Sequence, residues 1–157
     1  ILVHSGILDK ISNYEQLAAL LGHEATHVKE RHSVKILSRA ISGYIIVSAV
    51  TGDVNGIMST IADNANQLNN LSYSRDFEES SDAGSYQILR KNKINPKGLE
   101  ELFSILKEKE GLEIPKILST HPITNDRINF AKKLIHQNEY TSIPHQELEQ
   151  LFTELKK

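Results

Sequence analysis

The chain has 157 residues, which fits one compact domain, and its 39% hydrophobic and 24% charged residues exclude a disordered chain without a core. The net charge of −2, from 18 basic and 20 acidic residues, excludes the basic footprint of a nucleic-acid-binding domain. There is no cysteine, which excludes disulfides, thiolate zinc sites and thiol nucleophiles.

The N-terminal segment predicts a short strand followed by a helix. Residues 1–8 begin with β-branched side chains, a pattern typical of a strand and turn. Ser12 and Glu15 match a capping box, and Asn13 is a second candidate cap. Leucines at helical spacing then predict a helix that runs to about Arg31. A glycine inside a helix costs about 1 kcal/mol relative to alanine, so the one in this helix indicates close packing against a neighbouring backbone.

The rest of the chain predicts further helices separated by polar or proline-containing segments. They are expected over residues 34–50, 54–68, 74–91, 96–111, 124–137 and 144–155. The segment 112–122 holds two prolines, which indicates a loop. These elements predict a mainly α fold with a small β element. We expect a single domain, with a core over about residues 1–135 and a C-terminal helical extension over about 142–157.

The most apolar segment, residues 41–50, is too short to span a membrane, which takes about 20 apolar residues. Arg39 and Asp53 bracket it closely. We therefore interpret it as a buried helix of a soluble domain, and the alternative is a hairpin that touches a membrane. The chain begins at Ile1 without a methionine or a cleavage-site pattern, so we expect residues upstream, where a signal or a membrane anchor would lie.

The pentapeptide H-E-A-T-H at residues 23–27 carries the clearest chemistry in the sequence. Residues four apart on a helix point in nearly the same direction, so His23 and His27 project from one face and are able to share one metal ion. Glu24 lies beside that face, where its carboxylate is able to take a proton from a metal-activated water. The alternative is a pair of surface histidines next to a solvated glutamate.

Two imidazoles do not hold zinc firmly, so a third ligand is expected from elsewhere in the chain. A third histidine six positions further on would be Ser33, and on a continuous helix His32 lies about 140° away and points elsewhere. The E-x-x-x-D pattern on a later helix offers Glu78 instead, which would complete a two-histidine, one-glutamate zinc site. Asp82, one turn on, is able to accept the second ring N–H of a ligating histidine. Solvated acidic residues on an exposed face are the alternative.

A third pattern, H-P-I-T-N-D-R at residues 121–127, places His121 in a loop before a helix, although a lone loop histidine is usually solvated. In this order the three patterns resemble the M48 family of zinc metallopeptidases, which carry L-A-A-x-L-x-H-E-x-x-H, S-R-x-x-E-x-x-x-D and H-P-x-x-x-x-R. The matching segments are residues 17–27, 74–82 and 121–127. The Arg31-His32 pair also fits the family pattern, and the likeness covers about residues 1–135.

The resemblance implies an α+β fold of the zincin type and a zinc-dependent endopeptidase. One Zn²⁺ per chain would be held by His23, His27 and Glu78, with Glu24 as the general base. The substrate would be a polypeptide, in a role in protein quality control, and would lie extended against the strand expected around Ile1. By analogy, the bacterial periplasm or cell envelope is the expected compartment.

The resemblance also places His121 near the metal. It would either donate to the developing oxyanion or act as a fourth ligand in a resting state, and the sequence leaves both open. Arg127 is expected to anchor this loop through Asp82 or a backbone carbonyl. A second hypothesis is a zinc-stabilised module that binds client proteins without cutting them. A di-iron carboxylate protein would need a second E-x-x-H, which the sequence lacks.

Overall fold

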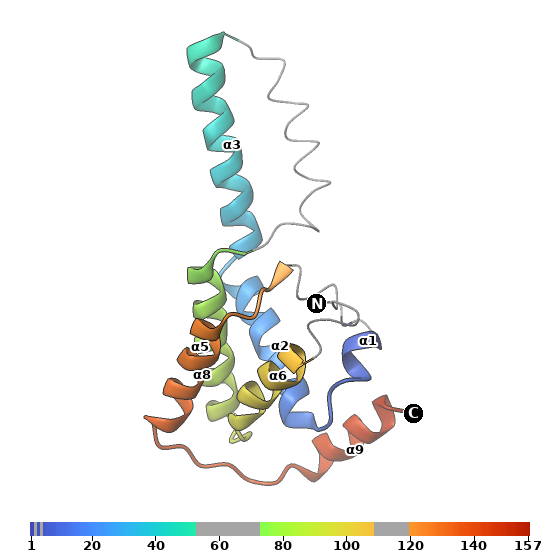
Figure 1. Ribbon diagram of the computed structural model, residues 1–157. Helices are drawn as coiled ribbons and strands as arrows, with labels where there is room; N and C mark the ends of the chain where they lie inside the picture. The colour runs from blue at the N-terminus through green and yellow to red at the C-terminus, as the bar shows by residue number, and fades with distance from the viewer. Residues whose placement is uncertain (2, 4, 53–72, 109–119) are drawn as a thin grey trace.

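The computed structural model describes residues 1, 3, 5–52, 73–108 and 120–157. This part of the chain is mostly helical, which confirms the predicted mainly α class. Its helices are α1 (Ser5–Leu8), α2 (Tyr14–Lys29), α3 (His32–Thr51), α5 (Arg75–Lys91), α6 (Lys97–Glu108), α8 (Asn125–His136) and α9 (Gln146–Leu155) (Figure 1). The helix expected over residues 54–68 lies outside the described residues.

The predicted N-terminal strand does not occur among the described residues. Residues 5–8 form helix α1, and residues 1 and 3 belong to no strand, whereas residues 2 and 4 lie outside the description. A helical turn is favoured because Ile7 and Ile11, four residues apart, both enter the core from this segment. The substrate-pairing strand expected around Ile1 is therefore absent from the described part.

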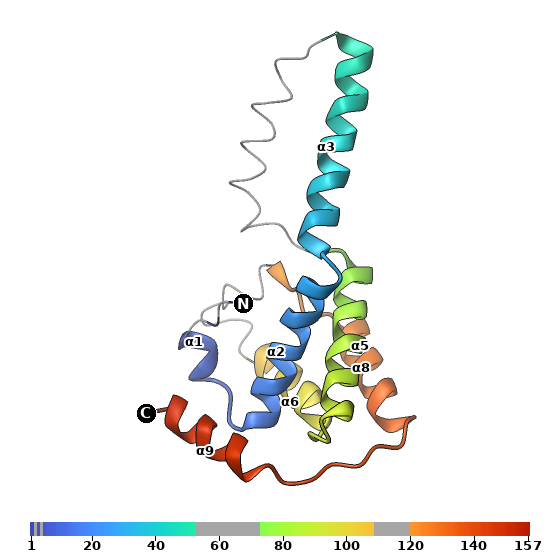
Figure 2. The same cartoon turned by 180° about the vertical axis from the view of Figure 1, so that it is seen from behind.

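Helices α2, α5, α6 and α8 form one body around a shared hydrophobic core. α2 packs against α5 and α6, and α8 lies across both of these helices. Two views from opposite sides show that α3 projects away from this body, whereas α9 lies near its other end (Figures 1 and 2). α9 is anchored by Phe152, which is buried in the core, and by Lys156, which donates to the carbonyl of Ile11.

The ends of α2 differ in detail from the sequence prediction. Asn13 is the N-cap, since its Oδ1 accepts from the backbone N–H of Gln16 at 2.9 Å. The side chain of Gln16 in turn accepts from the backbone N–H of Ser12, so the capping box predicted for Ser12 and Glu15 is wrong. The helix ends at Lys29 because Arg31 adopts a left-handed conformation, with φ of 55°.

Two glycines allow α2 and α5 to approach closely. A Cβ on Gly22 of α2 would lie 3.2 Å from the Cα of Ser85, which confirms the predicted approach of a neighbouring backbone. A Cβ on Gly84 of α5 would lie 2.9 Å from the Cβ of Thr26. The hydroxyl of Ser85 donates to the carbonyl of Ala19 at 2.7 Å and ties the helices together. The short separation of α2 and α5 thus depends on Gly22 and Gly84, because neither position has room for a methyl group.

Helix α3 contradicts the prediction that its apolar segment is buried. Ile45, Ile46 and Val50 are 52%, 66% and 83% exposed. The left-handed turn at Arg31 directs α3 away from the body, so its second half does not reach the core (Figure 2). A run of apolar residues indicates apolar surroundings, but it does not distinguish a protein core from other apolar surroundings. By length and composition, residues 32–50 are long and apolar enough to cross a membrane.

We expect Gly84→Ala to lower the free energy of unfolding by about 1–3 kcal/mol, because the added methyl group forces α2 and α5 apart. Urea unfolding followed by circular dichroism measures the change. Gly43→Ala is the matched control, since no atom lies within 4 Å of the added Cβ and alanine favours the helix. Equal stability of the Gly84→Ala variant and the unsubstituted chain would contradict the close approach.

Candidate metal centre

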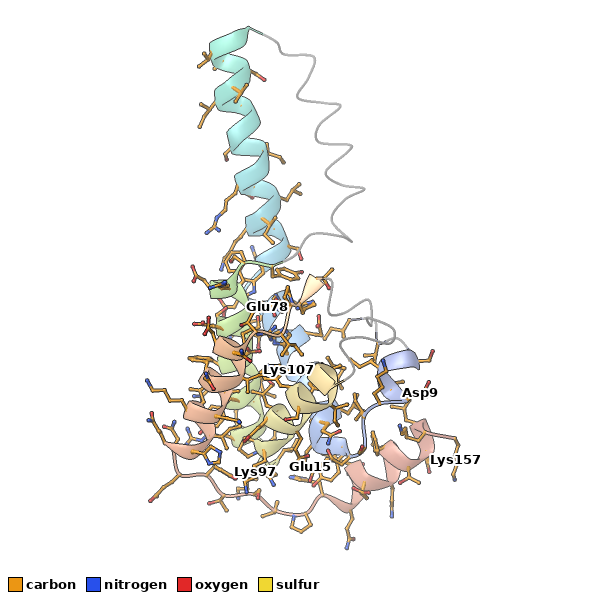
Figure 3. The ribbon with its side chains drawn as sticks, in the orientation of Figure 1. Asp9, Glu15, Glu78, Lys97, Lys107 and Lys157 are labelled. Carbon is orange, nitrogen blue, oxygen red and sulfur yellow. The ribbon has the colours of Figure 1, made fainter. Side chains whose placement is uncertain are left out.

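The three ligands predicted from the sequence meet at one end of the helical body. His23 and His27 lie one turn apart on α2, and their Nε2 atoms are 3.0 Å apart. Glu78 approaches from α5, with one carboxylate oxygen 3.4 Å from Nε2 of His23 and the other 3.3 Å from Nε2 of His27. All three side chains are buried. Figure 3 shows Glu78 at the end of the body from which α3 projects.

His121 joins this group from the loop before α8. Its Nδ1 lies 3.2 Å from Nε2 of His23 and 3.0 Å from a carboxylate oxygen of Glu78. One donor atom from each of the four residues lies within 4.8 Å of the others. A tetrahedral zinc ion, with bonds of about 2.0–2.1 Å, places its ligand atoms about 3.3 Å apart. Nitrogen and oxygen donors at these separations fit a zinc ion.

The charges of the buried groups also favour a cation. Glu78 and Asp82 are buried carboxylates, and Arg127 is the buried cation that pairs with both, so the group has a formal charge of −1 when the histidines are neutral. Burial disfavours a charged His23, but hydrogen bonds to Asp82 and Glu78 outweigh it and raise its pKa to about 9. Burial alone would raise the pKa of Glu78, but its histidine partners and Arg127 hold that pKa well below its usual range. The raised pKa of His23 and the lowered pKa of Glu78 both indicate a site that attracts positive charge.

Asp82 and Arg127 support the ligands from outside the cluster. The Nδ1–H of His23 donates to Asp82 at 2.9 Å, which directs the Nε2 lone pair toward the other donor atoms. Arg127 donates from Nε and Nη2 to both oxygens of Asp82, at 2.8 and 2.7 Å. Its Nη1 donates to the carbonyl of Pro122 and lies 2.6 Å from Glu78. Arg127 therefore has both kinds of partner expected from the sequence, a carboxylate and a backbone carbonyl.

His32 is a site residue that the sequence analysis missed. The expectation that it points elsewhere assumed a continuous helix, but the chain turns at Arg31 and brings Nδ1 of His32 to 3.0 Å from Nδ1 of His27. Its ring stacks on Phe77 at 4.2 Å, and its Nε2 lies 3.3 Å from the hydroxyl of Ser80. Neither glycine nor proline marks the turn. The only signal in the sequence was that His32 fits the family pattern.

Tyr73 was also missed. Its ring lies 4.1 Å from that of His27 and 5.0 Å from that of His121, between centroids. Its hydroxyl is 2.7 Å from that of Ser33, and its backbone N–H donates to the carbonyl of Thr120. Tyr73 thus ties the start of α5 to the His121 loop. Its position directly before the second motif was the available signal.

Glu24 lies beside the cluster and outside the ligand group. Its side chain is 24% exposed, and its Oε1 is 3.6 Å from Nε2 of His121. This oxygen is buried and has no hydrogen-bond partner among the described residues. A buried acceptor without a partner next to the metal-binding group is able to receive a proton from a molecule that enters the site.

Comparisons with known proteins identify the family of this chain. The chain is 29% identical to metalloprotease YcaL of Escherichia coli (strain K12) over 85% of its own length and 54% of the relative's. It is 30% identical to the mitochondrial metalloendopeptidase OMA1 of Schizosaccharomyces pombe, over 82% of its length and 39% of the relative's. It is 22% identical to the beta-barrel assembly-enhancing protease of Yersinia pestis, over 87% and 31%. The chain thus spans about half the length of these relatives or less. The model of peptidase family M48 matches residues 1–135, and the chain belongs to this family.

Proposed function

We propose that the chain is a zinc-dependent endopeptidase with one Zn²⁺ held by His23, His27 and Glu78. The observation that carries this proposal is the convergence of these buried donors, from two helices, at separations that fit one zinc ion. Membership of family M48 and the metalloprotease relatives support the same reaction. When bound, zinc lowers the pKa of a water molecule and polarises the scissile carbonyl.

Glu24 is the proposed general base. It accepts a proton from the attacking water at its unpartnered Oε1 and passes the proton to the leaving amine. Its partial exposure leaves it in contact with the solvent side of the site, whereas Glu78 is fully enclosed. The two glutamates therefore have separate roles, because Glu78 is buried between Arg127 and the histidines, whereas among the described residues Glu24 contacts this network only through His121, at 3.6 Å.

His32 is the proposed positioning residue for His27. The hydroxyl of Ser80 donates to the carbonyl of Phe77 at 3.0 Å, so its oxygen accepts from Nε2–H of His32. Nδ1 of His32 then accepts from Nδ1–H of His27, which leaves the Nε2 lone pair of His27 for the metal. Asp82 does the same for His23.

His121 is the proposed fourth ligand of a resting state. Its Nδ1 belongs to the same group of donor atoms as His23, His27 and Glu78. Four protein ligands close a zinc site, whereas a catalytic site keeps one position open. Its loop must therefore move before a substrate is cut.

The position of His121 also supports a second candidate function. A site that stays closed by four protein ligands would hold zinc as a structural ion. The chain would then bind client proteins without cutting them. Digestion experiments separate the two candidates.

The proposed substrates are polypeptides of the bacterial cell envelope, and the proposed role is protein quality control. The support is the name of the beta-barrel assembly-enhancing proteases, to which 87% of this chain aligns. The proposed location in the periplasm or envelope rests on the same relatives.

Casein digestion tests the reaction. We expect the zinc-loaded chain to cut casein and a chelator to abolish the cleavage. Glu24→Gln removes the base and keeps the ligands, so it should retain zinc and lose cleavage by at least about 10²-fold. Gels and metal analysis on the same samples measure both. Cleavage retained by the Glu24→Gln variant would remove Glu24 from its role, and zinc binding without any cleavage would favour the client-binding module.

Metal analysis tests the third ligand. Glu78→Gln replaces a buried anionic ligand by a neutral amide, so we expect zinc content to fall from one equivalent per chain to well below it after dialysis. Glu79→Gln, on the neighbouring and less buried residue of α5, is the matched control and should keep its zinc. Full zinc occupancy of the Glu78→Gln variant would mean that another residue supplies the third ligand.

Competition with a chelating dye tests His32. We expect His32→Ala to weaken zinc binding by about 10–100-fold, because the tautomer of His27 is no longer fixed. His32→Asn retains a side-chain acceptor near the position of Nδ1 and should restore part of the affinity, which a purely packing role would not. His136→Ala, on the exposed side of α8, should bind zinc normally. Equal affinities of all three variants would contradict the positioning role.

A further inference from the structure

Helix α3 carries a long uncharged segment that the proposed peptidase reaction does not use. Residues 40–51, the tip of α3, hold no charged side chain, and the tip projects away from the helical body (Figure 1). We propose that the tip inserts into one leaflet of a membrane with anionic headgroups. This proposal concerns where the chain works and does not depend on whether it cuts peptides.

The surface of the tip is suited to lipid rather than to water. Ile45 and Ile46 point about 100° apart on the helix and are 52% and 66% exposed, and Val50 is 83% exposed. The other positions of the tip are apolar, small or hydroxyl-bearing, so no face carries charge. A helix that packs on the helical body has one apolar and one charged side. In α6, for example, Leu99 and Leu102 are buried and charged residues lie on the other side.

The length of the tip favours insertion into one leaflet over a complete crossing. Twelve helical residues extend about 18 Å, slightly more than half of a hydrocarbon core of about 30 Å. The first two turns of α3 are not free to enter the membrane. His32 is buried beside His27, and the charged ends of Lys35 and Arg39 lie over the ring of Phe77, at 5.7 and 5.1 Å.

A basic collar lies between the body and the tip, and its positive charge indicates that the lipid headgroups are anionic. It consists of Lys29, Arg31, Lys35 and Arg39, all exposed. Glu30 lies 3.9 Å from Lys29 and 4.0 Å from Lys35 and leaves residues 29–39 with a net charge of +3, although the whole chain has −2. Positive charge next to an inserted apolar helix is the arrangement that binds anionic headgroups. A second copy of the chain is a less suitable partner for the tip, because the two positive collars would repel each other.

Tryptophan fluorescence tests the insertion directly, because the chain has no tryptophan. In the zinc-loaded Ile46→Trp chain, we expect blue-shifted emission when vesicles of phosphatidylcholine and phosphatidylglycerol are added. Lipids brominated on their acyl chains should quench this emission, and aqueous iodide should not. Leu151→Trp, on an exposed site of α9 at the far end of the body, is the matched control and should show no shift (Figure 1).

Vesicle flotation tests the residues. We expect at least about tenfold more chain to float with anionic than with neutral vesicles, and the double variant Lys35→Gln with Arg39→Gln to lose that preference. Ile46→Asp should abolish flotation. Circular dichroism and zinc content should stay unchanged in both variants, since these side chains do not contact the donor atoms, which separates lost insertion from lost folding.

Two outcomes would overturn the proposal. One is that no chain floats with anionic vesicles although the protein is folded and binds zinc. The other is that the emission of the Ile46→Trp chain is already blue-shifted without lipid and does not change when vesicles are added. The tip would then be covered by protein, and sedimentation equilibrium would tell a second copy from another part of the same chain.

Discussion

The burial of two carboxylates on one face of α5 is the constraint on which the arrangement of this protein depends. An ionised carboxylate leaves water only if other groups compensate its charge. Glu78 and Asp82 have Arg127 from α8 and His23 from α2 as partners, so three helices must meet at this point. When the histidines are neutral, the remaining formal charge of −1 makes this group of side chains a place for a cation.

The two histidines of α2 are held by different parts of the chain. Asp82 orients His23 from α5, and His32 orients His27 from the first turn of α3. The histidines can share a metal with Glu78 only if α2 and α5 are close, which Gly22 and Gly84 allow. The spacing of the helices and the directions of the imidazoles are thus set by separate residues.

The sequence predicted the convergence of His23, His27 and Glu78 because helical periodicity and motif spacing are local properties of a chain. It also placed most described helices within a few residues of their ends. It failed for His32 because the left-handed turn at Arg31 has no glycine or proline to announce it. It failed for residues 5–8 because tertiary burial of Ile7 outweighed the β-branched pattern. It failed for the tip of α3 because an apolar run does not reveal what surrounds it.

The turn at Arg31 connects the candidate metal centre to the projecting helix. His32 begins α3, contacts His27, and stacks on Phe77, whose ring also lies beneath the charged end of Arg39. A displacement of α3 would therefore move a partner of His27 together with Lys35 and Arg39 of the basic collar. Because His32 contacts His27, which belongs to the donor group, such a displacement would change the geometry of the site. No contact between the tip and a substrate would be needed. The direction of α3 and the orientation of His27 are consequences of the same backbone turn.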